Sequence, residues 1–128
     1  MAEFPKKKTI LIVDDDPDIR SIVRLVLESA GFLVGEAATG EEGLKTVKRI
    51  NPDAILLDLM METIDAGRNV SRELREAGFE APVYLLSSVG DTVRDNVHPE
   101  DLGLAGIFQK PIDPQILLTT LKTKLNIS

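Results

Sequence analysis

Short apolar runs alternate with longer helical patterns along most of the chain. The runs are rich in valine, isoleucine and leucine and carry few charges, as in strands that are buried on both faces of a parallel sheet. Regular alternation of such strands with helices is typical of an α/β fold. The expected strands are residues 9–13, 32–37, 54–57, 82–86 and 105–108.

Helix signals fill the intervals between these strands. Asp16 and Pro17 predict the start of the first helix, because proline is favoured in a first turn, and Gly31 predicts its end. The inward stripe of this helix is expected to hold Ile19, Ile22, Val23, Val26 and Leu27.

The second helix has a capping box formed by Thr39 and Glu42, and Asn51 with Pro52 ends it. A third helix is expected over about residues 66–77, where Gly78 follows. Its inward side is expected to hold Val70 and Leu74.

A fourth helix, within residues 91–102, rests on a thin apolar pattern. Asp113 and Pro114 predict the cap and first turn of a fifth helix. Five strands and five helices in alternation predict an open, doubly wound α/β sheet, and 128 residues suit a single domain, 1–128, with its core at about 8–125. The last helix is expected to run through Ile116, Leu117, Leu121 and Leu125.

Composition limits the partners and the compartment. Fifteen basic and twenty-one acidic side chains give a net charge of −6, which disfavours direct binding of nucleic acid because phosphate backbones bind basic surfaces. The chain has no cysteine, so disulfides and thiolate metal sites are excluded. The apolar run after the N-terminal lysines is too short for a signal peptide or a membrane span. We therefore expect a cytoplasmic protein without a membrane segment.

Polar residues gather at the carboxyl ends of the predicted strands, where ligands bind in doubly wound sheets. These ends carry Asp14 and Asp15, Asp58, Ser87 and Lys110. Two carboxylates about 4 Å apart repel by roughly 4 kcal/mol at an effective dielectric constant near 20, so such a cluster favours a cation. An all-oxygen set suits Mg²⁺, which binds few carboxylates beside a phosphate.

The same residues suit phosphoryl transfer. An aspartate such as Asp58 can be a nucleophile that forms an acyl phosphate, while Lys110 and Ser87 can hold phosphoryl oxygens. Each feature alone is more often a helix cap or a turn residue, and capping is the better interpretation of Asp16. The coincidence of these features at matching strand ends favours a phosphoryl-transfer site.

Four segments of the chain resemble the response-regulator receiver family of two-component signalling, the CheY-like receivers. They are the first strand with its acidic loop, 10–17, the acceptor strand, 53–59, the strand that ends in hydroxyl residues, 82–88, and the lysine-proline turn, 109–111. The resemblance covers about residues 8–125 and implies a flavodoxin-like fold with strand order 2-1-3-4-5.

This resemblance implies roles for the acidic residues. Asp58 would accept phosphate from a phosphohistidine of a sensor histidine kinase or a phosphotransfer protein. The domain would then be a regulatory phosphoacceptor and not an enzyme. Asp15 would bind Mg²⁺ directly and Asp14 mostly through water, with the Met60 carbonyl as a further ligand.

The resemblance also implies how phosphorylation would act. Lys110 and Ser88 would bind phosphoryl oxygens, and Ser87 would move toward the phosphate. The surface near the fourth helix, fifth strand and fifth helix would then change and act on an unknown output partner or on a second copy of the chain. Ile107 stands where the family usually has an aromatic switch residue, and strand alternation points Phe108 to the opposite face.

Two further positions depart from the family pattern. Met61-Glu62 replaces its usual Met-Pro, and Ala66 follows Asp65 where a glycine is common. His98 precedes a proline, which favours a loop position over a role as phosphodonor or ligand.

Two other classes of function fit parts of this pattern. A docking or dimerisation module that is never phosphorylated would suit the missing aromatic at Ile107, but the full set of acids with Ser87 and Lys110 argues against it. An enzyme that binds a dinucleotide would need a glycine-rich turn after the first strand. A dedicated phosphatase would need a general acid and a cap domain, and we find neither in the sequence.

Overall fold

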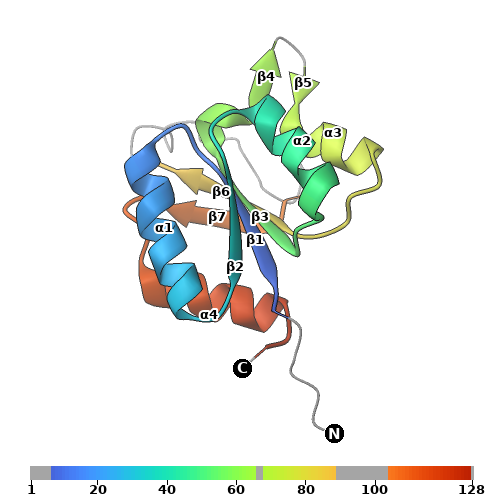
Figure 1. Cartoon of the computed structure of the whole chain (residues 1–128). Coiled ribbons are helices and arrows are strands. Elements are labelled where there is room, and N and C mark those ends of the chain that lie inside the picture. Colours follow the sequence, from blue (N-terminus) through green and yellow to red (C-terminus); the bar gives the residue numbers. More distant parts are fainter. Residues whose placement is uncertain (1–6, 66–67, 89–103, 128) are drawn as a thin grey trace, which may run out of the picture.

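A computed structural model describes residues 7–65, 68–88 and 104–127 of the chain. Within these residues, five parallel strands form one central sheet with helices on both faces (Figure 1). The order in space is β2-β1-β3-β6-β7, which confirms the predicted 2-1-3-4-5 when these five strands are counted along the chain. The strands are β1 (Thr9–Val13), β2 (Leu33–Ala37), β3 (Ala54–Asp58), β6 (Val83–Ser87) and β7 (Gly106–Gln109).

Four α-helices lie in the described part of the chain. Helices α1 and α4 cover one face of the sheet, and α2 and α3 cover the other (Figure 1). Among the described residues, no helix combines the length and the apolar character needed to cross a membrane. The helix predicted within 91–102, together with His98, lies outside the described residues. The four helices are α1 (Pro17–Ser29), α2 (Gly40–Ile50), α3 (Val70–Glu76) and α4 (Pro114–Lys124).

The strands feed two separate cores because successive side chains point to opposite faces of a sheet. In β1, Ile10 and Ile12 pack in the core under α1 and α4, while Leu11 and Val13 pack in the core under α2 and α3. All four side chains are buried, which confirms a central strand covered on both sides. Each strand of this kind holds the polar residues at its carboxyl end in a rigid frame.

The predicted starts of α1 and α2 are confirmed by side-chain caps. The Asp16 carboxylate accepts a hydrogen bond from the Asp18 amide at 2.8 Å, and Thr39 Oγ1 accepts one from the Glu42 amide at 3.0 Å. The Glu42 carboxylate accepts a hydrogen bond from the amide of Ala38, the residue before the cap, at 3.2 Å. Such caps satisfy amides that have no partner within the helix.

The third helix begins later than predicted, at Val70 instead of about residue 66. A 3₁₀ helix, η1 (Leu59–Met61), and an antiparallel hairpin of β4 (Thr63–Asp65) and β5 (Arg68–Asn69) come first. Glu62 explains the difference, because its carbonyl accepts the Val70 amide at 2.8 Å and its buried carboxylate accepts the Ser71 hydroxyl at 2.6 Å. These two bonds tie the start of α3 to η1.

Two apolar residues of the predicted helices lie on the surface. Ile22 in α1 is 56% exposed, so its expected inward position is wrong, and Ile116 in α4 is 57% exposed. Each precedes a fully buried neighbour, Val23 and Leu117. A helix turns by about 100° per residue, and the contact with the sheet is narrower than the apolar stripe in the sequence.

Candidate functional site

Three carboxylates meet at the carboxyl edge of the sheet. Asp14 and Asp15 follow β1, and Asp58 is the last residue of β3. One carboxylate oxygen from each lies within 4.8 Å of the others, with Asp14 and Asp58 buried and Asp15 exposed. The cluster is therefore held by two neighbouring strands and reaches solvent on the side of Asp15.

Lys110 brings a positive charge to this cluster from the end of β7. Its Nζ lies 2.8 Å from Asp14 Oδ2 and 3.7 Å from Asp58 Oδ1. Its amide donates to the Ser87 carbonyl at 2.7 Å, so the lysine is fixed to the end of β6. Burial alone would lower the pKa of Lys110, but its hydrogen bond to Asp14 and the charge of Asp58 outweigh this and raise it.

The Asp58 carboxyl has a pKa above its ordinary value. Burial is the main cause, and the negative charges of Asp14 and Asp15 add to it. The Met60 amide, 3.2 Å from Asp58 Oδ1, and the Lys110 charge act in the opposite direction. Asp58 is thus a poorly hydrated carboxylate. The charged and polar groups around it would interact directly with any cation or phosphoryl group placed beside it.

The donor set fits a hard divalent cation. Asp14 Oδ1 accepts the Asp16 amide at 2.9 Å. Its other oxygen, Oδ2, is buried and pairs with the Lys110 ammonium at 2.8 Å. A carboxylate oxygen can accept more than one bond, so Oδ2 keeps capacity for a further ligand. A buried oxygen with spare capacity, next to two more carboxylates, is the kind of ligand that Mg²⁺ binds. Asp14, Asp15 and Asp58 could hold this ion.

Ser87 lies next to Lys110 at the end of the sheet. Ser87, the last residue of β6, is buried, and its Oγ donates to the Ser88 carbonyl at 3.3 Å. In the sheet register Ser87 stands opposite Gln109, directly before Lys110. The main chains of Ser87 and Lys110 therefore lie side by side, as predicted.

Ile107 and Phe108 lie on opposite faces of β7, as alternation predicts. Ile107 pairs with Leu85 and is 43% exposed. Phe108 is buried in the core under α1 and α4, where its ring centroid lies 5.0 Å from that of Tyr84. Phe108 therefore cannot stand in for the missing aromatic at position 107 without turning the strand over. Met60 has an exposed side chain, and its contact with the site is through its amide.

Two residues of this region were missed from the sequence, Arg20 and Glu36. Arg20 Nη1 donates to the main-chain carbonyl of Asp14 at 2.6 Å, and its Nε pairs with Glu36 Oε1 at 2.9 Å. One signal was available: a positive charge near the start of a helix is disfavoured by the helix dipole, so an arginine there suggests a specific contact. The partner could not be known before the strand order.

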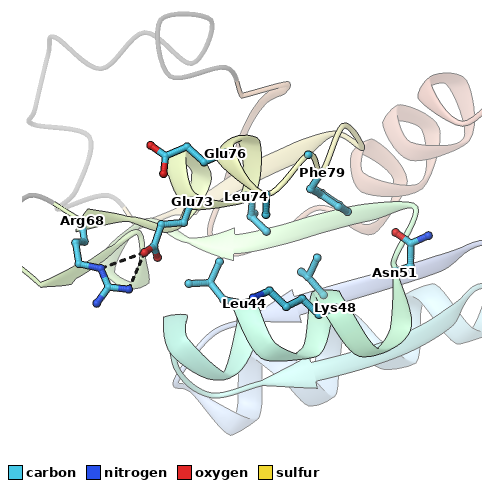
Figure 2. Close-up of a pocket in the computed structure, with 11 residues that line it drawn as sticks. Leu44, Lys48, Asn51, Arg68, Glu73, Leu74, Glu76 and Phe79 are labelled. Carbon is cyan, nitrogen blue, oxygen red and sulfur yellow. Dashed lines mark hydrogen bonds and ion pairs between the residues drawn. The ribbon is translucent and has the colours of Figure 1, made fainter.

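A separate hollow of about 580 Å³ lies between α2 and α3 (Figure 2). Its lining includes the apolar residues Leu44, Leu74 and Phe79, with the ion pair of Arg68 and Glu73 at one end. None of the described residues that line it belongs to the acidic cluster. The hollow is therefore not part of the site at the sheet edge.

The sequence model of the response regulator receiver domain matches residues 10–122. Among curated proteins, the chain is 37% identical over 116 residues to response regulator MprA of Mycobacterium leprae, covering 91% of this chain and 50% of that protein. It is 36% identical over 118 residues to the DNA-binding dual master transcriptional regulator RpaA of Synechocystis, covering 91% and 48%. The chain spans about half the length of the curated relatives it matches.

Solved structures of similar proteins have the same fold. A putative response regulator from Chloroflexus aurantiacus aligns with a TM-score of 0.82 at 32% identity, covering 94% of this chain and 99% of that one. The chemotaxis response regulator CheY4 of Vibrio cholerae aligns with a TM-score of 0.78 at 27% identity, covering 92% and 98%. The acidic triad of Asp14, Asp15 and Asp58 is typical of the receiver Mg²⁺ site. The chain thus belongs to the response regulator receiver domain family of two-component signalling, whose members are regulatory phosphoacceptors and not enzymes in the usual sense.

Proposed function

We propose that this chain is the phosphoacceptor switch of a two-component phosphorelay and that Asp58 takes the phosphoryl group. The observation that carries the proposal is the position of Asp58: its buried carboxylate ends β3, shares a cluster with Asp14 and Asp15, and has Lys110 Nζ at 3.7 Å. A purely structural purpose would not explain this arrangement, because clustered carboxylates repel one another.

In the proposed reaction an Asp58 carboxylate oxygen attacks the phosphorus of a phosphohistidine. The new P–O bond forms an acyl phosphate while the P–N bond breaks and its electron pair returns to the imidazole. The phosphohistidine belongs to a sensor histidine kinase or a phosphotransfer protein. Phosphoryl transfer of this kind depends mainly on positioning and on charge neutralisation.

The metal ligands in this proposal are the acidic residues and one carbonyl. Asp15 and Asp58 bind Mg²⁺ directly, Asp14 acts mostly through water, and the Met60 carbonyl completes the set from the protein. When bound, the ion neutralises charge on the carboxylates and on the phosphoryl oxygens. Lys110, already paired with two of the acids, can move its ammonium to a phosphoryl oxygen.

Ser87 and Ser88 are the proposed groups that sense the phosphate. Ser87 Oγ now donates weakly, at 3.3 Å, to the neighbouring carbonyl and is free to exchange that bond for a phosphoryl oxygen. The change passes to the exposed surface around Ile107 and α4 and so alters an output partner or a second copy of the chain. Converting such a switch from 1:99 to 99:1 needs about 5.5 kcal/mol of differential stabilisation.

The wider context is part of the same proposal. The chain is taken as a single receiver domain that works in the cytoplasm and does not itself bind nucleic acid, in keeping with its net charge of −6. One of the relatives, RpaA of Synechocystis, is a DNA-binding regulator about twice as long as the matched region. The output partner, a domain of the same chain or a separate protein, would act on DNA or on another target.

The test is intact-mass analysis after incubation with Mg²⁺ and acetyl phosphate. Wild-type protein should gain one phosphate, and chelation of the metal should abolish the gain. Asp58→Asn should gain none, whereas the matched control Asp18→Asn, at an exposed position in the first turn of α1, should behave as wild type. Phosphate on Asp58→Asn, or none on wild type, would refute the proposal and favour a docking module that works without phosphorylation.

A further inference from the structure

We propose that Arg20 is a positioning residue of the acidic site, which, held by Glu36, fixes the main chain of Asp14 and so sets the geometry of the metal ligands. Arg20 Nη1 donates to the Asp14 carbonyl at 2.6 Å, and Arg20 Nε pairs with Glu36 Oε1 at 2.9 Å. The inference rests on the proposed function in one respect, namely that Asp14 and Asp15 serve a bound cation.

The contact joins three elements that are distant in the chain. Arg20 lies in α1, Glu36 in β2, and Asp14 at the end of β1, so a single guanidinium connects the helix, the edge strand and the acidic loop. A planar guanidinium can donate in two fixed directions at once, which a lysine ammonium cannot reproduce with the same geometry. The link therefore constrains direction as well as distance.

Three of the four polar groups of Asp14 make hydrogen bonds with other protein groups. Its amide donates to the Ala37 carbonyl at 3.1 Å, its carbonyl accepts Arg20, and its Oδ1 accepts the Asp16 amide at 2.9 Å. Its Oδ2 is left to face Lys110 at 2.8 Å and any cation at the cluster. Fixing the backbone in this way aims the carboxylate oxygen that faces Lys110 and the cluster.

Glu36 is itself held by a second arginine. Arg24 Nε pairs with Glu36 Oε2, and Arg24 Nη2 donates to the Val34 carbonyl at 3.2 Å. The hydrogen bond from Arg24 is the main reason why the pKa of Glu36 lies below its ordinary value, and the bond from Arg20 adds to the effect against the opposing effect of burial. Glu36 is thus an anion that holds Arg20, whereas the contacts of Arg24 are with Glu28, Glu36 and the Val34 carbonyl.

Charge and position predict opposite signs for the loss of Arg20. If the arginine acted only as a positive charge near the cluster, its removal would lower the repulsion felt by Mg²⁺ and tighten binding. If it positions Asp14, its removal loosens a ligand and weakens binding. Groups that orient metal ligands from outside typically change metal affinity by about 10- to 100-fold when mutated.

The test measures the Mg²⁺ dissociation constant, without any phosphodonor, from amide NMR shifts of Asp15 and Asp58. Arg20→Gln and the charge-preserving Arg20→Lys should both weaken Mg²⁺ binding by about tenfold. Glu36→Gln should weaken it less, because Arg20 would keep its bond to the Asp14 carbonyl. Arg49→Gln is the matched control: it removes the same charge at an exposed position of α2 and should leave the Mg²⁺ dissociation constant unchanged.

The following results would overturn the inference. Unchanged or tighter Mg²⁺ binding by Arg20→Gln would exclude a positioning role, and equal weakening by Arg49→Gln would assign a general effect of losing a positive charge. Thermal unfolding of all four variants separates loss of structure from loss of ligand geometry. If wild type binds Mg²⁺ but takes up no phosphate, the proposed function fails and the Arg20 inference stands. Wild type that binds no Mg²⁺ would overturn both.

Discussion

At the scale of single residues, the site consists of three carboxylates that share one positively charged side chain, Lys110. Asp14, Asp15 and Asp58 lie within 4.8 Å of one another through one oxygen each, and Lys110 is closer to Asp14 than to Asp58. Two carboxylates at such distances repel by roughly 4 kcal/mol at an effective dielectric constant near 20. The folded protein therefore carries repulsion that a bound cation would relieve.

Asp58→Asn should raise the free energy of unfolding at neutral pH, without metal, by about 1 kcal/mol. The folded pKa of Asp58 is raised above its unfolded value, so its stabilising contribution is complete below the unfolded pKa and is lost as pH rises through the folded pKa. The ionised wild-type residue is thus unfavourable at neutral pH, and asparagine removes that charge.

Urea unfolding of both proteins checks this prediction across a pH series. The advantage of the variant should shrink from about pH 7.5 to about pH 4.5, since the wild-type carboxyl takes up its proton in the acid range. An advantage that stayed constant over the series, or a variant less stable than wild type at neutral pH, would contradict the electrostatic explanation. Asp18→Asn, at the exposed start of α1, is the control for replacing any aspartate.

At the scale of elements, helix α2 approaches the end of β1 through a glycine. A Cβ built on Gly43 would lie 2.9 Å from Val13 Cγ2 and 3.2 Å from Val13 Cγ1. Val13 is buried, has little rotamer freedom as a β-branched residue, and directly precedes Asp14. The close packing of α2 is thus connected to the position of the acidic loop.

Gly43→Ala should destabilise the protein by about 1–3 kcal/mol, because the new methyl group overpacks the contact with Val13. Helix propensity acts in the opposite direction, since alanine is favoured over glycine by roughly 1 kcal/mol in a helix. Urea unfolding measures the net change in the free energy of unfolding. The same substitution in a Val13→Ala background should cost much less, and a neutral or stabilising Gly43→Ala would show that α2 can move away freely.

At the scale of the whole molecule, one sheet separates two cores and presents its polar strand ends at one edge. The strands β1, β3 and β6 are covered on both faces, and their buried residues alternate between the core under α1 and α4 and the core under α2 and α3. A rigid centre of this kind allows side chains from β1, β3 and β7 to meet at fixed distances. The site thus depends on the integrity of both cores.

Leu56→Ala should lower the free energy of unfolding by about 2–5 kcal/mol, because it leaves a cavity in the core between the sheet and helices α1 and α4. The matched control is Leu25→Ala in α1, where the leucine is 69% exposed and the change should stay within about 0.5 kcal/mol. Chemical denaturation gives both values. Similar losses for the two variants would mean that Leu56 is not in a closely packed core.

Features that depend on neighbouring residues could be predicted from the amino-acid sequence. The five strands of the sheet, the caps at Asp16 and Thr39 and the opposite faces of Ile107 and Phe108 all follow from periodicity or from bonds across two or three positions. The candidate acids were also found in this way, because the carboxyl ends of parallel strands share one edge. Asp58 stands at the end of β3, as its apolar run indicated.

Features that depend on distant contacts could be found only in the folded protein. The late start of α3 at Val70 follows from bonds to Glu62, and the exposure of Ile22 follows from how little of α1 meets the sheet. The pair of Arg20 with Glu36 joins residues 16 apart in the chain and exists because β2 lies beside β1. Local patterns cannot encode such a pair, since its energy depends on the distance that the complete fold sets between the two charges.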